Sequence, residues 1–202
     1  MYQMGNYSTA RLCGCKLLRR KRIAPNLARP NAQFGRNFAA QNVTGGRMAI
    51  TIREASSADA QLIVDLITEL ARYEQEEDSV KVTAADLYRQ MTQERPPFAC
   101  AIAENDGRAV GFALYFFAYS TWEGKQTLYL EDLYVSPEFR GTGAGAKLMG
   151  YLAHVANQRN CARFEWSVLD WNTAAIGFYN RIGAKPVAGW TRYRVDPKLI
   201  AC

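Results

Sequence analysis

Histidine and long apolar runs, on which many metal sites, catalytic triads and membrane spans depend, are scarce in this 202-residue chain. Its one histidine, His154, stands among apolar residues in the run LAHVA and is interpreted as a packed or half-exposed helix residue. A metal site is therefore not expected, nor is a Ser-His-Asp or Cys-His centre. The five cysteines are odd in number and scattered, so no disulfide framework is predicted and a cytoplasmic, reducing compartment is favoured. No apolar run approaches the roughly 18 residues that a membrane span needs.

Acidic side chains are absent from residues 1–47, which carry nine basic ones. Residues 48–202 hold 16 basic and 19 acidic side chains, so their net charge is −3 although the whole chain carries +6. The body therefore favours a cationic small molecule over a nucleic acid or a membrane surface. We interpret 1–47 as a disordered N-terminal extension, with a mitochondrial targeting peptide or a non-native leader as alternatives. Residues 48–202 are expected to form one domain.

Hydrophobic periodicity predicts alternating strands and helices from Met48 onward. Ser56 or Ser57 is expected to cap the first helix, and Thr83 with Asp86 forms a capping-box pattern before the second. Asn-Asp-Gly-Arg at 105–108 predicts a tight hairpin. The strands are expected over 48–54, 98–104, 109–117, 127–135 and 163–168 and near 190–195, and the helices over 62–73, after Thr83, over 143–159 and over 173–182.

This order predicts an α/β (α+β) fold. The middle strands form an antiparallel meander, whereas a strand–helix–strand crossover at the end gives a parallel pair. The expected sheet is mixed, mainly antiparallel, and covered by helices on both faces. A doubly wound sheet is not predicted.

A glycine turn, Arg140 to Gly145 (RGTGAG), follows the strand at 127–135 and opens a helix. Helix N-termini carry unpaired N–H groups and a partial positive charge, and they therefore collect phosphates. A P-loop is excluded because GTGAGAK lacks the glycine before Lys147 and has Leu148 in place of the magnesium-binding hydroxyl. A dinucleotide fingerprint is formally present, with Glu165 downstream, but SPEFR intervenes between strand and turn.

Arg-x-x-Gly-x-Gly after a strand resembles the GNAT N-acetyltransferase family, whose members cradle the acetyl-coenzyme A pyrophosphate with it. The runs ELARYEQEE, LYLEDLYV, FRGTGAG and EWSVLDWNTAAIGFYNRIGA narrow the resemblance to the spermidine/spermine (diamine) N-acetyltransferase branch, over about residues 48–196. The resemblance implies a V-shaped splay between the fourth and fifth strands. It also implies acetyl transfer from acetyl-CoA to a small amine, without a metal.

The resemblance also implies catalytic roles. Glu131 is expected as a base through water or as an anchor for the ammonium, the Leu133 N–H as the oxyanion donor, and Tyr179 as the general acid near the sulfur. Because side chains alternate along a strand, Glu131 and Asp132 are expected on opposite faces. The expected cofactor-binding residues are Leu133, Tyr134, Val135, Arg140, Gly141, Thr142, Gly143, Ala144, Gly145, Ala146, Asn172, Thr173, Ala175, Tyr179 and Arg181.

Amine recognition is assigned to an acidic, aromatic-lined group of residues, in keeping with a cationic substrate. The members are Tyr73, Glu74, Trp122, Glu131, Glu165, Trp166 and Ser167. The polyamine enzymes carry a further acid before the final strand, where this chain reads KPVAGWT. A diamine or a lysine-like amino acid, thialysine included, is therefore as well supported as a polyamine. A protein or peptide acetyltransferase and a binder acting through the basic tail are the competing functions.

A homodimer is expected as well. The branch commonly forms dimers, and the aromatic-rich strand AVGFALYFFAYS (109–120) offers apolar surface for one.

Overall fold

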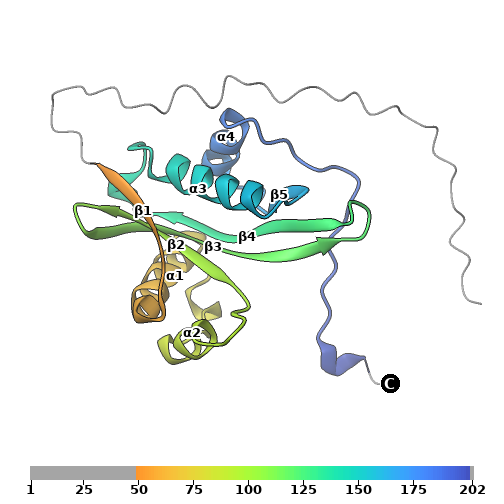
Figure 1. Cartoon of the computed structure of the whole chain (residues 1–202), viewed down its shortest axis with the longest axis horizontal. Helices are drawn as coiled ribbons and strands as arrows, with labels where there is room; N and C mark the ends of the chain where they lie inside the picture. The colour runs from red at the N-terminus through yellow and green to blue at the C-terminus, as the bar shows by residue number, and fades with distance from the viewer. Residues whose placement is uncertain (1–48, 201–202) are drawn as a thin grey trace, which may run out of the picture. The chain divides into compact units, whose positions relative to one another are not determined.

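A computed structural model describes residues 49–200 (Figure 1). Residues 1–47, interpreted above as an N-terminal extension, lie outside the described residues. The strands are β1 (Ile50–Glu54), β2 (Ala99–Asn105), β3 (Arg108–Ser120), β4 (Lys125–Val135) and β5 (Arg163–Trp166). The α-helices are α1 (Ala60–Glu74), α2 (Ala84–Met91), α3 (Ala144–Gln158) and α4 (Thr173–Arg181). Short 3₁₀ turns occupy Ser57–Asp59, Glu77–Ser79, Pro137–Phe139 and Pro197–Leu199.

The five strands form one sheet in the order β1-β2-β3-β4-β5. Neighbours from β1 to β4 are antiparallel, and β4 and β5 are parallel, which confirms the predicted mixed sheet. The β2–β3 hairpin turns at Asp106 and Gly107, whose φ angles are 51° and 79°. Positive φ at both central residues is what a type I′ hairpin turn requires and what Asp-Gly tolerates.

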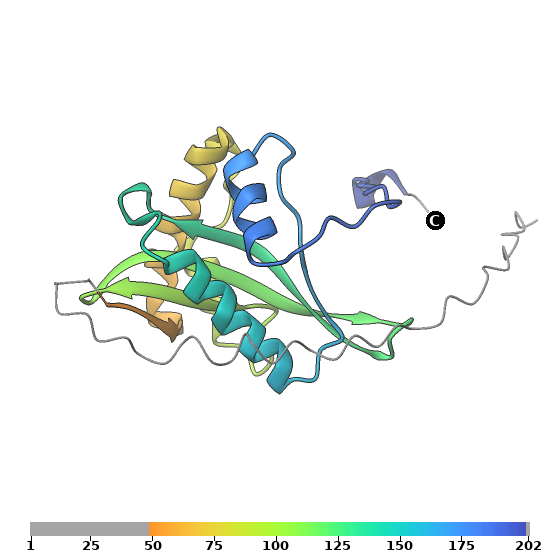
Figure 2. The same cartoon turned by 90° about the horizontal axis from the view of Figure 1, so that it is seen from above.

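Helices cover both faces of the sheet (Figures 1 and 2). The core on one face joins the sheet to α3 through Leu148 and Leu152, and α4 packs against it with Phe178. The core on the other face joins the sheet to α1 and α2 through side chains such as Ile63. The capping boxes at Ser56 and Thr83 are formed. Among the described residues, no helix is both long and apolar enough to cross a bilayer.

The last predicted strand is not formed. Residues 190–195 (WTRYRV) carry no helix or strand, and β5 ends at Trp166 instead of residue 168. Trp190 and Tyr193 are 81% and 91% exposed. The sequence alternates as a strand does, but a strand also needs a neighbour to pair with, and this segment leads away from the sheet (Figure 1).

Candidate active site

Strand β4 has a paired half and an open half. Residues Thr127–Leu130 pair with β5, whereas the pairing stops before 131–135. The N–H of Ser136 bonds to the carbonyl oxygen of Val110 at 2.9 Å, on the β3 side. Because N–H and C=O groups of an antiparallel strand point to alternate sides, those of Leu133 and Val135 point away from β3. They are therefore left to face the space where the two strands part, which corresponds to the expected splay.

A β-bulge separates the two halves of β4. Leu114 pairs with Asp132 and Tyr115 with Leu130, so Glu131 is the extra residue. Regular alternation would put Glu131 and Asp132 on opposite faces, but the bulge interrupts that alternation at Glu131, and both residues line the same cavity. The bulge shifts the alternation of side chains along β4 by one residue. Asp132 therefore lies on the face of the sheet that α1 covers, the same face as Tyr134.

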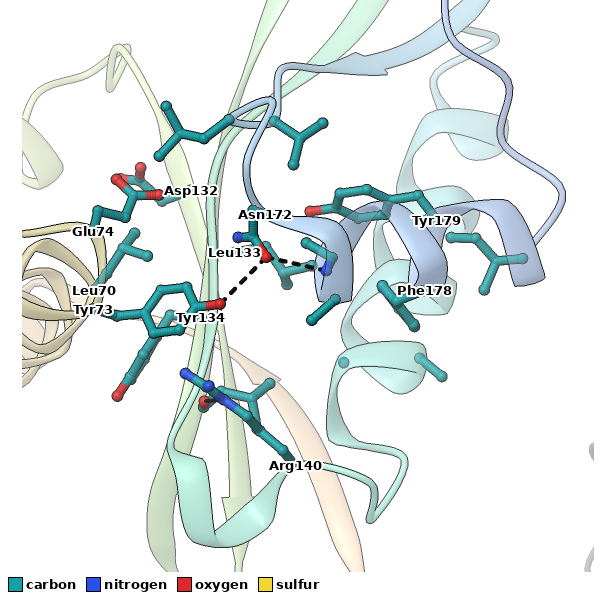
Figure 3. A pocket seen from close by; sticks show the side chains of 18 of the residues that line it. Leu70, Tyr73, Glu74, Asp132, Leu133, Tyr134, Arg140, Asn172, Phe178 and Tyr179 are labelled. Atoms are coloured by element: carbon teal, nitrogen blue, oxygen red, sulfur yellow. Dashed lines mark hydrogen bonds between the residues drawn. The ribbon is translucent and has the colours of Figure 1, made fainter.

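This cavity has a volume of about 760 Å³ and lies between the open half of β4, the C-terminal end of α1, the glycine turn and α4 (Figure 3). Figure 2 shows α1 and α4 at the same end of β4. Sixteen of the predicted site residues line it: Tyr73, Glu74, Glu131, Leu133, Tyr134, Val135, Arg140, Gly141, Gly143, Gly145, Ala146, Ser167, Asn172, Ala175, Tyr179 and Arg181.

The glycine turn brings a helix N-terminus to the cavity wall. Gly141 and Gly143 have φ angles of +78° and +95°, a region that favours glycine, and α3 begins at the next residue, Ala144. The first N–H groups of α3 have no acceptor within the helix. A Cβ added at Gly145 would approach Phe178 to 3.7 Å, so this wall is shaped closely by α4. The turn can hold a phosphate group through its backbone.

Arg140 lies across the cavity mouth between the turn and α1. Its Nε donates to the carbonyl oxygen of Val135 at 3.0 Å. Its guanidinium lies 4.5 Å from the ring centre of Tyr73 and 5.8 Å from that of Tyr134. The aromatic faces hold this cation beside the turn without neutralising it, so its charge remains available to an anionic ligand.

A hydrogen bond joins α1 to α4 over the cavity (Figure 3). The Tyr73 hydroxyl donates to Asn172 Oδ1 at 3.2 Å, and the Ala175 N–H donates to the same oxygen at 3.1 Å. Asn172 thus caps α4 and anchors Tyr73 at once. Trp171 stands beside Tyr73, with ring centres 6.0 Å apart. This arrangement fixes the position of α4, and with it Tyr179, relative to β4.

One end of the cavity is acidic. Burial raises the pKa of Asp132 to about 6, with Glu131 and Glu74 adding repulsion. Burial and the neighbouring Glu76 also raise the pKa of Glu74. Among the described residues, neither carboxylate has a hydrogen bond or an ion pair. Two nearby carboxyl groups without a cation are arranged to receive one.

Tyr179 stands on α4 with its ring packed against Trp166, at a centroid distance of 4.9 Å. Burial, and secondarily Glu74, raises the pKa of Tyr179 to about 12. The hydroxyl is therefore protonated throughout the neutral range, and it can donate a hydrogen bond into the cavity.

Six predicted site residues do not line this cavity. Thr142, Ala144 and Thr173 belong to the same turns as lining residues, and Ala144 is buried in the core. Trp166 contributes indirectly through its contact with Tyr179, while Glu165 lies 3.5 Å from Arg163. Trp122 is 88% exposed at the turn between β3 and β4.

Sequence reasoning missed several lining residues, including Leu70, Asp132, Phe178 and Arg192. A signal existed for Asp132: in LYLEDLYV the apolar residues stand at 128 and 130 and then at 133 and 135, so the period of two changes phase at the bulge. Arg192 donates to Ser167 Oγ at 2.6 Å and also to the Tyr129 hydroxyl. No local pattern predicts that contact, because Arg192 belongs to the segment expected as a strand.

Comparison with known proteins identifies the class to which this fold and site belong. The family model described as acetyltransferase (GNAT) family matches residues 63–184. The chain belongs to this family, and it is an N-acetyltransferase that acts on amines.

Two curated relatives are similar at the same level of identity. Thialysine N-epsilon-acetyltransferase of Sus scrofa is 39% identical over 159 residues, which cover 73% of this chain and 93% of the pig protein. Spermidine/spermine N(1)-acetyltransferase-like protein 1 of Homo sapiens is 39% identical over 155 residues, covering 72% of this chain but only 22% of the human protein. These relatives confirm the resemblance to the spermidine/spermine (diamine) N-acetyltransferase branch that the sequence motifs indicated.

Among solved structures, aminoglycoside N-acetyltransferase AAC(6')-Iy in complex with CoA has the same fold, with a TM-score of 0.60. It is 20% identical, and the match covers 76% of this chain and 98% of that one. The likeness shows the fold alone.

Proposed function

We propose that the protein transfers an acetyl group directly from acetyl-CoA to a primary amine of a small cationic molecule: a diamine, a polyamine or a lysine- or thialysine-like amino acid. One observation carries this proposal. The open half of β4 faces a cavity with a glycine-opened helix N-terminus at one end and, at the other, carboxylates that have no ion pair among the described residues (Figure 3). Such a cavity offers opposite electrostatic surroundings to an anionic cofactor and a cationic substrate.

The cofactor would lie along the open half of β4. Its pantetheine arm contains amide groups, which can pair with the N–H and C=O groups of Leu133 and Val135 that point away from β3, as an added strand would. The backbone of Gly141–Ala146 would then hold the pyrophosphate, with the Arg140 and Arg181 cations beside it. In this structure the Nε of Arg140 donates a hydrogen bond to the carbonyl oxygen of Val135. Arg140 would therefore have to turn from that carbonyl toward the phosphates.

Acetyl transfer places three demands on the cavity. The amine, with a pKa near ~10, must lose a proton, and Glu131 is our candidate to accept it through water. The tetrahedral intermediate carries an oxyanion, for which the Leu133 N–H is the candidate donor. The leaving thiolate, with a pKa near ~8.5, needs a donor as well, and the Tyr179 hydroxyl is the candidate.

The high pKa of Tyr179, about 12, defines its part more closely. A full proton transfer from a phenol at this pKa to a thiolate near ~8.5 would be uphill by about 5 kcal/mol. We therefore infer that Tyr179 acts chiefly as a hydrogen-bond donor while the negative charge on sulfur develops.

The proposal is tested by measuring thiol release from acetyl-CoA with diamines, polyamines, amino acids and peptides, and by identifying the acetylated product by mass spectrometry. We expect the small cationic amines to give the highest kcat/KM. A preference for peptides would favour the competing function of a peptide acetyltransferase. A covalent acetyl-enzyme that accumulates without an amine would contradict direct transfer.

We further propose a homodimer in a cytoplasmic setting. Strand 109–120 is the surface expected for dimerisation, but most of residues 109–115 of β3 is buried in the protomer's own core. We therefore assign the dimer surface to large apolar side chains that are exposed further along the chain. The exposed ones are Val187, Trp190, Tyr193, Val195, Leu199 and Ile200. A second copy covering this segment would remove them from water. Light scattering at micromolar concentration tests the proposal, and a monomeric mass would contradict it.

A further inference from the structure

A second hollow adjoins the candidate active site. It has a volume of about 320 Å³ and is lined by the last turn of α1 and by the chain from Glu76 to Val82. It shares three lining residues with the main cavity: Leu70, Glu74 and Asp132. Glu74 and Asp132 therefore form a common wall, and the second hollow continues the amine end of the main cavity.

The chain that follows α1 brings opposite charges to the rim of this hollow. Helix α1 ends at Glu74 and is capped by Gln75, whose φ of 61° is left-handed, and the Glu76 N–H returns to the carbonyl oxygen of Ala71 at 2.9 Å. Glu76 is held in turn by the Ser79 hydroxyl, which donates to its carboxylate at 2.8 Å. The tight turn leaves Glu76 and Lys81 on the same rim.

Lys81 differs from the other charged groups here. It is exposed, and within residues 49–200 it forms no ion pair or hydrogen bond, although Glu74, Glu76 and Asp132 line the same hollow. Arg72, the neighbouring cation on α1, is already paired with Glu77 at 2.6 Å. The hollow is thus lined by three carboxylates, and by one cation, Lys81, that is not paired with any of them.

We propose that the second hollow holds the remote end of the substrate, and that Lys81 makes the site select an α-amino acid over the diamine of the same chain length. The inference deepens the proposed function and rests on it. The side-chain amine would enter the main cavity beside Leu133. The α-ammonium would face Glu74, Asp132 and Glu76, and the α-carboxylate would pair with Lys81.

The charges favour this occupant over a diamine. A diamine places a second ammonium in the hollow, where the carboxylates attract it but Lys81 repels it and finds no partner. An α-amino acid carries both signs on adjacent atoms and satisfies both. The raised pKa values of Asp132 and Glu74 are consistent with a wall that lacks a cation until substrate arrives.

The test compares lysine with 1,5-diaminopentane, two molecules that differ only in the α-carboxylate. In the full-length protein, Lys81→Met should lower kcat/KM for lysine and raise it for the diamine, each by about 3- to 10-fold, because an exposed charge pair contributes little more. The change should lie mainly in KM, since Lys81 does not touch the reacting amine. Ornithine and 1,4-diaminobutane give an independent pair.

Two further variants complete the experiment. Lys81→Arg keeps the charge and should keep the preference for the amino acid. Lys185→Met removes the same charge from an exposed residue that lines neither cavity, so it controls for net charge and should leave the ratio of the two substrates unchanged.

The outcomes are separable. Equal effects of Lys81→Met on both substrates, or no effect on either, would overturn the role of Lys81 while leaving the proposed amine acetyltransferase intact. Failure of the parent protein to acetylate any amine would instead overturn the proposed function, and this inference with it.

Discussion

Two groups of charged side chains in this protein are arranged in opposite ways. On β1, Arg53 donates to Glu104 at 2.7 Å and to both carboxylate oxygens of Asp59 at 2.9 and 2.7 Å. The pairing lowers the pKa of Asp59 to about 2. At the open half of β4, Asp132 has no such partner among the described residues, and burial raises its pKa to about 6.

The presence or absence of a partner within the chain indicates whether a charged group serves the fold or a ligand. The Arg53 group has each charge satisfied within the chain, so it stabilises the fold and offers nothing to a ligand. The carboxylates of the cavity are costly to the fold, because burial without a partner disfavours their charged form. The proposed cationic substrate would supply the partner that these carboxylates lack. Variants in the two regions should therefore change stability and activity independently.

The largest expected effect is on catalysis, from Tyr179→Phe. The ring packs against Trp166 and Phe178, and phenylalanine keeps those contacts, so the melting temperature should hardly change. The hydroxyl is lost as a donor to the leaving sulfur, and kcat should fall by about 10²-fold or more. Single-turnover kinetics measures the rate of the chemical step, which should fall with kcat, and acetyl-CoA affinity should stay nearly constant. Full turnover by this variant would make Tyr179 a packing residue.

The next effect concerns the cofactor. Gly145→Val adds a branched side chain in the first turn of α3 at the cavity wall, where the Cβ itself meets only ordinary contacts, at 3.7 Å from Phe178 and 3.9 Å from Val135. We expect the fold to survive and the Kd for acetyl-CoA to rise by about 10-fold or more, because the side chain blocks the phosphate-binding N–H groups.

Gly150→Val is the matched control for this variant. It places the same side chain on the same helix at an exposed position, where an added Cβ meets nothing within 4 Å. Both variants share the helix-propensity change, so equal cofactor affinity in the two would remove the phosphate assignment. Gly143 is less suitable for this test because its φ of +95° strains any other residue.

Most of the fold and much of the lining of the candidate site could be predicted from the sequence, because the signals are local. The capping box at Thr83, the Asp-Gly hairpin turn and the glycine turn are each encoded by a few adjacent residues. The bulge at Glu131 and the position of Arg192 depend on contacts between distant segments. The same holds for the missing strand at 190–195, since its pattern satisfied the rule for a strand while its pairing partner was not encoded locally.

The next largest effect is on the free energy of unfolding, which should change in opposite directions when Asp132 and Asp59 are replaced. At pH 7, Asp132→Asn removes a partly buried charge and should stabilise the protein by about 1–3 kcal/mol. Asp59→Asn breaks the pair with Arg53 and should destabilise it by about 1–2 kcal/mol, since the Arg53 side chain is partly exposed. Urea unfolding measures both. Only Asp132→Asn should also raise KM for the amine. Destabilisation by Asp132→Asn would show that the carboxylate has a stabilising partner after all.

The smallest effect is the pH dependence of these differences, and its sign differs between the two sites. The folded-state pKa of Asp132, about 6, lies above the unfolded value near ~3.9. The folded state therefore binds more protons between these values, and the cost of Asp132 appears only as the pH rises from about 4 to 6. The advantage of Asp132→Asn should thus be nearly absent at pH 4 and complete at pH 7.

Asp59 behaves in the opposite sense. Its folded-state pKa of about 2 lies below the unfolded value near ~3.9. Its contribution is therefore present above pH 4 and is lost as the pH falls toward 2. At pH 4 Asp59→Asn should still be clearly less stable than the parent, while Asp132→Asn equals it. Urea unfolding of the three proteins at pH 3, 4, 5, 6 and 7 checks both slopes, since that of Asp59 lies below pH 4 and that of Asp132 above it. An advantage of Asp132→Asn that stays constant over this range would mean that packing of the amide, and not the charge, causes the stabilisation.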